Sequence, residues 1–271
     1  MATKIWTGAT SGDYSVSTNW SPSGVPTTTD DVHFTVDYAV DVTAGLNQSG
    51  TTISSITIDG FTGKIGSLSL GYLQLDVSGS AVLNTGGISF IDFGASSIDL
   101  DIRDSASGGT TRGLYILGAT LSVVSIQAGD VGIANQSGET STVTTLRMYR
   151  GAVTVGAGAT LTTLDMYGGT STVKTSATTV NNYGGSVTTS GAAAVTTLNQ
   201  YSGTMYANGT GTIATANIEG GELNFTGSGI ARTLTALTLK VGGTIVYDPS
   251  VLTITTQNES DIPVRLTASN A

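Results

Sequence analysis

An internal repeat limits the possible folds of this chain more than any other feature of its sequence. Two-residue turns recur from residue 150 onward, and the second residues of successive turns are separated by 18, 16, 18, 18 and 22 positions. A short run with β-strand character precedes and follows each turn. A unit of about 18 residues cannot bury its own apolar side chains, so successive units must stack on one another. The repeat predicts a β-solenoid. The turns are Arg150-Gly151, Gly168-Gly169, Gly184-Gly185, Ser202-Gly203, Gly220-Gly221 and Gly242-Gly243.

The composition fits an all-β protein with a polar but weakly charged surface. The chain has 271 residues with 37 glycines, and 39% of its residues are hydrophobic. Only 11% are charged, against roughly 25% in an ordinary soluble domain. The apolar residues come as short alternating runs, as in 73–77, which is typical of strands. We expect a right-handed parallel β-helix, with a left-handed or two-sided solenoid as the alternative, because 16 to 18 residues per coil is short.

The chain is expected to form one continuous domain with three parts. Residues 1–50 hold both tryptophans, two of the four prolines and the only histidine, and they are interpreted as an N-terminal cap. Residues 51–250 are predicted to form the coils. Residues 251–271 are more polar and are predicted to form a closing strand and an extended tail. Such ends matter because an uncapped solenoid adds further chains to its edges.

Strand alternation predicts which side chains of the repeats face outward. Leu146, Leu164 and Leu198 share one parity with Met148 and Met166, and we assign this parity to the core. The opposite parity gives two outward columns. These are Arg147, Asp165, Asn181, Asn199 and Asn217, and beside them Tyr149, Tyr167, Tyr183, Tyr201 and Glu219. We interpret the four tyrosines with the three asparagines as a candidate interface. It either only stabilises adjacent coils, or contacts another subunit or sugar rings.

Charge and residue usage exclude several classes of protein. Ten Lys and Arg against 19 Asp and Glu give a net charge of −9, which argues against nucleic-acid binding. The absence of cysteine excludes disulfides, thiolate nucleophiles and Cys-based metal sites. The first residues lack the apolar run of a signal peptide, and no stretch approaches the ~20 apolar residues of a membrane-spanning helix. We therefore expect neither a nucleic-acid nor a membrane partner.

Few side chains suggest catalysis. His33 is the only histidine and is interpreted as a strand residue of the cap. Asp99 and Asp101 fall on one face with Arg103, and Asp92 is placed one coil below them. Paired carboxylates of this kind occur in glycoside hydrolases, but a solvated, partly neutralised face is the preferred interpretation. No calcium-ligand loop or phosphate-binding glycine motif is present. We expect no catalytic residues, no metal and no cofactor.

The first 35 residues resemble a segment that opens many parallel β-helix proteins of tailed-phage virions and of autotransporter-like bacterial surfaces. The resemblance is carried by five short motifs, with Tyr14 where tryptophan is common. The motifs are Ile5-Trp6-Thr7-Gly8, Ser11-Gly12-Asp13-Tyr14-Ser15, Thr18-Asn19-Trp20-Ser21-Pro22, Gly24-Val25-Pro26 and Asp30-Asp31-Val32. Beyond these motifs the chain is similar only in its short alternating strand runs and glycine turns. Its 271 residues leave no counterpart to a membrane-anchoring barrel.

The resemblance implies a non-enzymatic structural protein of a tailed-bacteriophage virion, most simply a capsid decoration protein assembled in the host cytoplasm. The alternatives are an extracellular adhesin or glycan-binding module at the cell surface and, less favoured, a polysaccharide-degrading tail enzyme. The expected partners are capsid or other virion proteins and further copies of the chain. The tail segment 261–266 alternates apolar and polar residues, so it is expected to add as a strand to a neighbour, with a trimer as the leading assembly.

Overall fold

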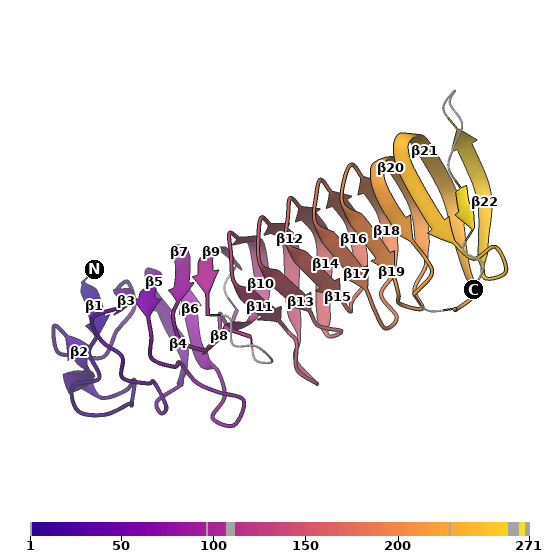
Figure 1. Cartoon of the computed structure of the whole chain (residues 1–271). Coiled ribbons are helices and arrows are strands. Elements are labelled where there is room, and N and C mark those ends of the chain that lie inside the picture. The colour runs from indigo at the N-terminus through magenta and orange to yellow at the C-terminus, as the bar shows by residue number, and fades with distance from the viewer. Residues whose placement is uncertain (1, 96, 107–111, 228, 260–265, 269–271) are drawn as a thin grey trace. The chain divides into compact units, whose positions relative to one another are not determined.

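The computed structural model describes residues 2–95, 97–106, 112–227, 229–259 and 266–268 (Figure 1). The named elements in this part of the chain are 23 strands and one short 3-10 helix, η1 (Ser17–Asn19). Parallel coils stack on one another, so the predicted all-β solenoid is confirmed. No helix among the described residues is long and apolar enough to cross a membrane.

The chain packs into two compact units. Unit 1 comprises Met1–Ala134 with Gly138–Thr142, and unit 2 comprises Asn135–Ser137 with Val143–Ala271. Each unit has its own stack of coils, and each coil contributes strands to two faces.

Unit 1 contains two faces of parallel strands. Its first face pairs β1 (Thr3–Trp6), β3 (Asp31–Thr35), β5 (Ser55–Phe61), β7 (Ser80–Thr85), β9 (Ser97–Ser105) and the second half of β10 (Leu114–Ile126). Its second face pairs β4 (Asn47–Ile53), β6 (Leu73–Val77), β8 (Ser89–Asp92), the first half of β10 and β11 (Asp130–Ile133). The coils are long and unequal: Val32 pairs with Ile56, Ile56 with Ala81 and Ala81 with Leu100, which are steps of 24, 25 and 19 residues.

Aromatic side chains fill the start of unit 1. Trp6, Tyr14, Trp20 and Phe34 are all buried, with ring centroids 5.2 Å apart for Trp6 and Trp20 and 4.7 Å apart for Tyr14 and Trp20. Both indoles find acceptors, because Trp6 Nε1 donates to the Val40 carbonyl at 2.9 Å and Trp20 Nε1 donates to the Tyr14 carbonyl at 2.8 Å. The strand that carries Trp20, β2 (Trp20–Ser21), pairs antiparallel with β1. The aromatic residues of the N-terminal motifs therefore form a core.

The polar residues of the same motifs fold the connecting loops. Asn19 is fully buried, and its Oδ1 accepts from the amides of Thr10 and Ser11 at 2.8 and 3.0 Å. Its Nδ2 donates to the Asp13 carbonyl at 2.7 Å. Asp30 acts similarly and accepts from the Ala2 amide at 3.0 Å. Each of these side chains satisfies backbone groups that the loop leaves unpaired.

Unit 2 is built from shorter and more even coils. One face contains β12 (Ser141–Met148), β14 (Ala159–Met166), β16 (Ala177–Asn182), β18 (Val195–Gln200), the first parts of β20 (Ile213–Asn224) and β21 (Arg232–Tyr247), and β22 (Leu252–Glu259). The other contains β13 (Ala152–Val155), β15 (Thr170–Val173), β17 (Ser186–Thr189), β19 (Thr204–Ala207), the last parts of β20 and β21, and β23 (Leu266–Ala268).

The predicted core parity of unit 2 is confirmed. The inward residues Leu146, Met148, Leu164, Met166 and Leu198 have no exposed surface. Strand register stacks like positions on one another: Leu164 pairs with Val180 and Val180 with Leu198, in steps of 16 and 18 residues. Because like positions coincide from coil to coil, the apolar side chains form continuous columns inside unit 2.

The repeated glycine turn closes each coil tightly. Gly169 has a φ of 78° and Gly185 a φ of 85°, which glycine adopts without steric cost. A Cβ atom on either residue would lie 2.6 Å from the carbonyl oxygen of the turn glycine one coil earlier, which is Gly151 for Gly169. The glycines at 16- to 18-residue spacing are therefore needed both for the turn and for close stacking of the coils.

Two amide side chains occupy core positions that alternation alone would give to apolar residues. Asn182 and Gln200 are fully buried at the positions that Met148 and Met166 hold in earlier coils. Gln200 Nε2 donates to the carbonyls of Ser202 and Gly203 at 2.7 and 2.9 Å, and Asn182 Nδ2 donates to Gln200 Oε1 at 3.2 Å. Since buried polar groups need partners, these amides are satisfied by the turns that they support.

Candidate docking face

The four repeat tyrosines form a continuous stack on the outside of unit 2, here called the tyrosine column. Each tyrosine directly follows the C-terminal residue of one of the strands β12, β14, β16 and β18 and is 37 to 45% exposed. The four residues are Tyr149, Tyr167, Tyr183 and Tyr201. Neighbouring ring centroids are 5.0, 5.0 and 4.9 Å apart, and the ring planes differ by 9°, 8° and 2°. The rings cover one another's faces, so the column presents ring edges and phenol oxygens to solvent.

A ladder of side-chain hydrogen bonds runs beside the tyrosine column and is called the amide ladder. Asn181 Nδ2 donates to Asp165 Oδ1 at 2.8 Å, Asn199 Nδ2 to Asn181 Oδ1 at 2.8 Å, and Asn217 Nδ2 to Asn199 Oδ1 at 2.9 Å. The Arg147 guanidinium lies 3.9 Å from Asp165 Oδ2. The structure thus brings together all seven predicted interface residues on one face.

Threonines form a third outward column that the sequence reading missed. Thr163, Thr179, Thr197 and Thr215 pair in register on the same strands as the amide ladder and are half-buried. Their two-residue offset from the asparagines places them on the same face. The same alternation that identified the asparagines would have identified these threonines. The outer face is therefore three side chains wide.

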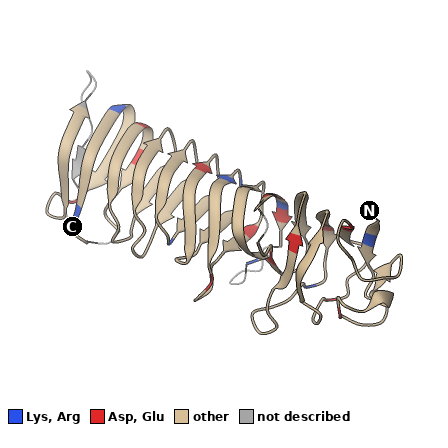
Figure 2. Ribbon diagram, turned by 180° about the vertical axis from the view of Figure 1, so that it is seen from behind, with Lys and Arg blue, Asp and Glu red and all other residues tan. Residues whose placement is uncertain are grey.

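This face is polar but close to neutral, unlike the chain as a whole. The charges of Arg147 and Asp165 offset each other, and at the far end Lys240 Nζ lies 2.5 Å from Glu219 Oε1. Figure 2 shows that most of the ribbon of unit 2 carries no charged residue. Partial burial, together with the nearby Tyr201, Asp165 and Tyr167, raises the pKa of Tyr183 above its ordinary value. The Tyr183 phenol consequently stays uncharged at neutral pH.

The carboxylates on β9 are placed as predicted, with one correction. Asp99, Asp101 and Arg103 alternate with buried residues on β9, and Arg103 Nε lies 3.2 Å from Asp101 Oδ2. Asp92, however, is not one coil below them. It lies on β8 and pairs with Leu117 on the second face of unit 1, because the coils there are too unequal for simple counting. Among the described residues no group of three or more acidic or histidine side chains is arranged to hold a metal.

His33 lies on β3, in the coil that follows the N-terminal strand. It alternates with the buried residues Val32 and Phe34 and is itself half-buried. Its backbone pairs with Thr57 on β5. The interpretation of His33 as a strand residue is therefore confirmed.

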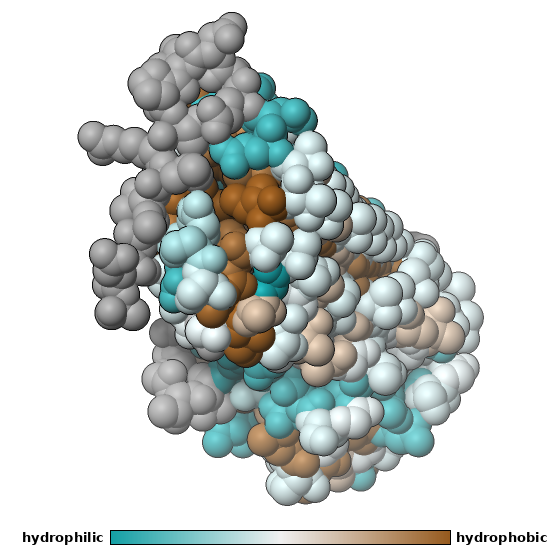
Figure 3. All heavy atoms as spheres, turned by 90° about the vertical axis from the view of Figure 1, so that its right-hand side faces the viewer, coloured by the Kyte–Doolittle hydropathy of each residue, from teal (hydrophilic) through white to brown (hydrophobic). Residues whose placement is uncertain are grey.

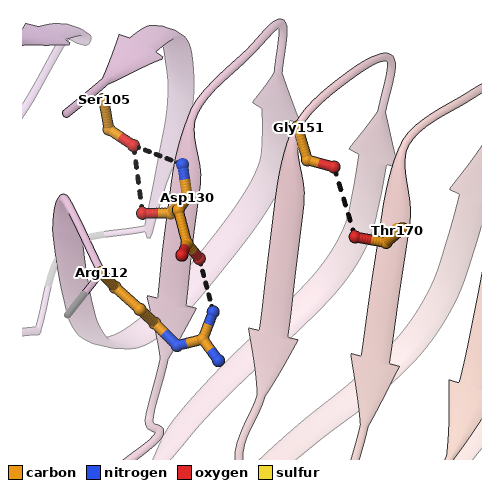
Figure 4. A network of polar contacts seen from close by, with 5 residues as sticks. All are labelled: Ser105, Arg112, Asp130, Gly151 and Thr170. Atoms are coloured by element: carbon orange, nitrogen blue, oxygen red, sulfur yellow. Dashed lines mark hydrogen bonds and ion pairs between the residues drawn. The ribbon is translucent and has the colours of Figure 1, made fainter. Parts of the chain in front are cut away.

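A polar network in unit 1 was not predicted from the sequence. Arg112 Nη1 lies 2.5 Å from Asp130 Oδ1, and Ser105 Oγ accepts from the Asp130 amide at 2.8 Å and donates to its carbonyl at 3.0 Å (Figure 4). The network ties the end of β9 to the start of β11. In unit 2, Figure 4 shows the contact between Thr170 Oγ1 and the Gly151 carbonyl, 3.5 Å apart. Both contacts join residues from different coils.

The predicted tail strand 261–266 falls mainly outside the described residues, of which only Leu266 is part of β23. The final strand of the first face, β22, pairs with β21 and with no other described strand. Its register places Gln257 beside Leu237, so a polar residue ends that apolar column. Figure 3 looks onto this end of unit 2 and shows apolar residues at the surface among polar ones.

Comparison of the chain with protein-family models, with curated proteins and with solved structures gives no match. The geometry of the outer face is consequently the basis on which a function is proposed.

Proposed function

We propose that this protein is a non-enzymatic structural protein of a tailed-bacteriophage virion, where it decorates and stabilises the capsid. The observation that carries the proposal is the outer face of unit 2. Its tyrosines and amides are held by one another at regular spacing, so little side-chain freedom is lost when a partner binds. Tyrosine is also enriched in protein interfaces, because it offers apolar area with a polar tip.

The near-neutral charge of this face supports contact with a protein surface. An acidic chain that docks through its charged residues would require a basic partner. Here the ion pairs at the two ends of the face cancel, and the middle presents only hydroxyls, amides and phenols. The resemblance of the first 35 residues to virion β-helix proteins supports a capsid as the partner.

The same face supports self-association. A regular column on the side of a solenoid is suited to contact between side-by-side copies, and such contacts close by rotational symmetry. We propose a homo-oligomer, with a trimer as the leading form. Size-exclusion chromatography with light scattering measures the mass of the assembly directly. A strictly monomeric chain at micromolar concentration would contradict this part of the proposal.

The capsid role is tested by co-sedimentation of the purified protein with capsids built from the capsid protein encoded in the same genome. The wild-type protein should pellet with capsids. The double variant Tyr167→Ser, Tyr183→Ser should bind about tenfold more weakly, a loss of about 1.4 kcal/mol. The matched control, Asp99→Asn with Asp101→Asn, should bind like the wild type. A wild-type protein that stays in the supernatant would contradict the proposal.

A further inference from the structure

A cavity of about 210 Å³ lies where the tyrosine column ends. The coil after Tyr201 carries Glu219 in place of a fifth tyrosine, so among the described residues Tyr201 has an aromatic partner on one face only. The other face of its ring is directed toward the coil of Glu219. The cavity is lined by Asn199, Tyr201, Asn217, Ile218, Glu219, Thr238 and Lys240. A ring that enters this cavity can stack on the free face of Tyr201.

The amide ladder has a direction, and that direction determines what the cavity offers to a ligand. The Asp165 carboxylate only accepts hydrogen bonds, so Asn181 must turn its Nδ2 toward it. Asn181 then presents Oδ1 to Asn199, and Asn199 presents Oδ1 to Asn217. At the end of the ladder, Asn217 Oδ1 accepts no hydrogen bond from any described residue. The ladder thus presents an oriented acceptor to the cavity.

The rest of the lining is polar but carries no net charge. Thr238 pairs with Asn217 in the strand register and adds a hydroxyl to the cavity. Glu219 and Lys240 form an ion pair, so together they offer hydrogen-bond acceptors and donors without attracting an ion of either sign. The volume is below the roughly 300 Å³ at which pockets for drug-sized ligands begin, so the cavity suits one small ring.

We propose that this cavity binds one pyranose ring of a neutral saccharide. The C–H face of the sugar stacks on the free face of Tyr201, one hydroxyl donates to Asn217 Oδ1, and a neighbouring hydroxyl reaches Glu219 or Thr238. An aromatic floor with convergent polar groups meets both the apolar face and the hydroxyl edge of such a ring. This proposal does not rest on the proposed virion role, although the cavity shares Tyr201, Asn199 and Asn217 with the outer face.

The site is tested by NMR titration of the full-length protein with methyl glycosides of glucose, galactose, mannose and N-acetylglucosamine. At least one should bind with a Kd on the order of 1–10 mM, as expected for a single ring. Tyr201→Ala should weaken binding about tenfold or more, and Tyr201→Phe should retain most of it because the ring remains. Tyr149→Ala is the matched control, since it removes the tyrosine at the opposite end of the column, and it should bind like the wild type.

The ladder provides a second test with residues that do not touch the sugar. Asp165→Asn removes the carboxylate that sets the direction of the ladder, and it should weaken binding about threefold. Arg147→Gln removes the ion pair but keeps the carboxylate, and it should leave binding unchanged. Circular dichroism melting identifies any variant that is not folded.

Two results would overturn the proposal. One is that no glycoside of the panel perturbs resonances of the cavity residues at roughly 50 mM, well above the expected Kd. The other is that folded Tyr201→Ala binds as tightly as the wild type. Binding of free adenosine in the same titration, with no binding of any glycoside, would also overturn it and would identify a nucleobase as the stacking ring.

Discussion

The two units of this protein use aromatic residues in opposite ways. In unit 1 the tryptophans are inside, and Trp6 and Trp20 are buried at the start of coils whose lengths differ by several residues. In unit 2 the aromatic stack is outside, on coils with nearly equal steps, and the core is mainly aliphatic, with Phe225 as a buried aromatic residue. Large aromatic rings fill the irregular space of unequal coils, whereas equal coils bring identical residues into register. A column of like side chains therefore depends on regular coil length.

The largest expected difference in stability is between removing a buried aromatic side chain of unit 1 and removing an exposed one of unit 2. Trp20→Ala leaves a large cavity between Trp6, Tyr14 and Phe34 and should lower the free energy of unfolding by about 3–5 kcal/mol. Tyr149→Ala removes a half-exposed ring from the end of the column and should cost at most about 1 kcal/mol. Urea denaturation measures both. Equal costs would show that the contrast between the units has no energetic meaning.

Aliphatic core positions should be equally important in both units. Leu164→Ala in unit 2 and Leu100→Ala in unit 1 each remove a fully or almost fully buried side chain and should each cost about 2–5 kcal/mol. Asn199→Ala removes a side chain of the outer face of unit 2 that makes two hydrogen bonds in the amide ladder. It should cost only about 0.5–1.5 kcal/mol. An Asn199→Ala variant less stable than Leu164→Ala would contradict the assigned parity.

A smaller effect is expected for the buried amide at the turn of unit 2. Asn182→Ala removes the donor to Gln200 Oε1 and one of the two acceptors of the Gly184 amide, which also donates to the Met166 carbonyl, and it should cost about 1–3 kcal/mol. Asn182→Met restores the residue type that earlier coils carry at this position, and it should recover part of the loss. Thermal melting compares the two variants. An alanine variant as stable as the wild type would mean that the turn does not need the amide.

Tyr183 should make unit 2 sensitive to alkaline pH. The pKa of Tyr183 is raised above its ordinary value by burial and by Tyr201, Asp165 and Tyr167, so the folded coil favours the neutral phenol. Its contribution to stability is fully present below a pH of about 10 and is lost as the pH rises through the higher pKa of the folded state. Absorbance titration at alkaline pH should show one late-titrating phenol fewer in Tyr183→Phe, whereas Tyr14 and Tyr72, whose pKa values burial also raises, titrate late in both proteins. The same titration curve in both proteins would contradict the coupling.

The smallest effect is expected for the carboxylates on the outer face of unit 1. Asp99 and Asp101 lie on a strand where neighbouring coils contribute Val82, Val123 and Ser125, so no column of like residues forms there. Asp99→Asn and Asp101→Asn should leave capsid binding unchanged and alter stability by less than about 0.5 kcal/mol. Loss of a measured hydrolase activity in Asp101→Asn would instead indicate that this strand carries an active site.

The sequence allowed the outer face to be predicted because the repeats of unit 2 align without ambiguity. Once Leu164 and Leu198 are assigned to the core, Asp165 and Asn199 must point outward. The same rule places Asn182 and Gln200 inward, but a buried amide is recognised only when its partners in the turn are known. Asp92 was misplaced because the coil lengths of unit 1 vary, so counting residues does not give the strand register.

The cavity beside Tyr201 was beyond reach of sequence reasoning for a different reason. Its shape depends on an irregularity in the pairing of β20 with β21 between Ile218 and Gly220, and on the ion pair of Glu219 with Lys240. The sequence shows that glutamate replaces tyrosine at position 219. It does not show whether the glutamate fills the space that the missing ring leaves.

The in-register pairing of unit 2 has a consequence for how such a gene changes. Each coil from β14 to β19 is bonded only to the coil before it and the coil after it, at a constant offset. Duplication or loss of one such coil in the DNA would lengthen or shorten the outer face by one tyrosine and one asparagine, and both ends of the unit would keep their own sequences. The number of coils can therefore drift during evolution while the spacing between neighbouring side chains stays fixed, and relatives of different length would present the same pattern over a different distance.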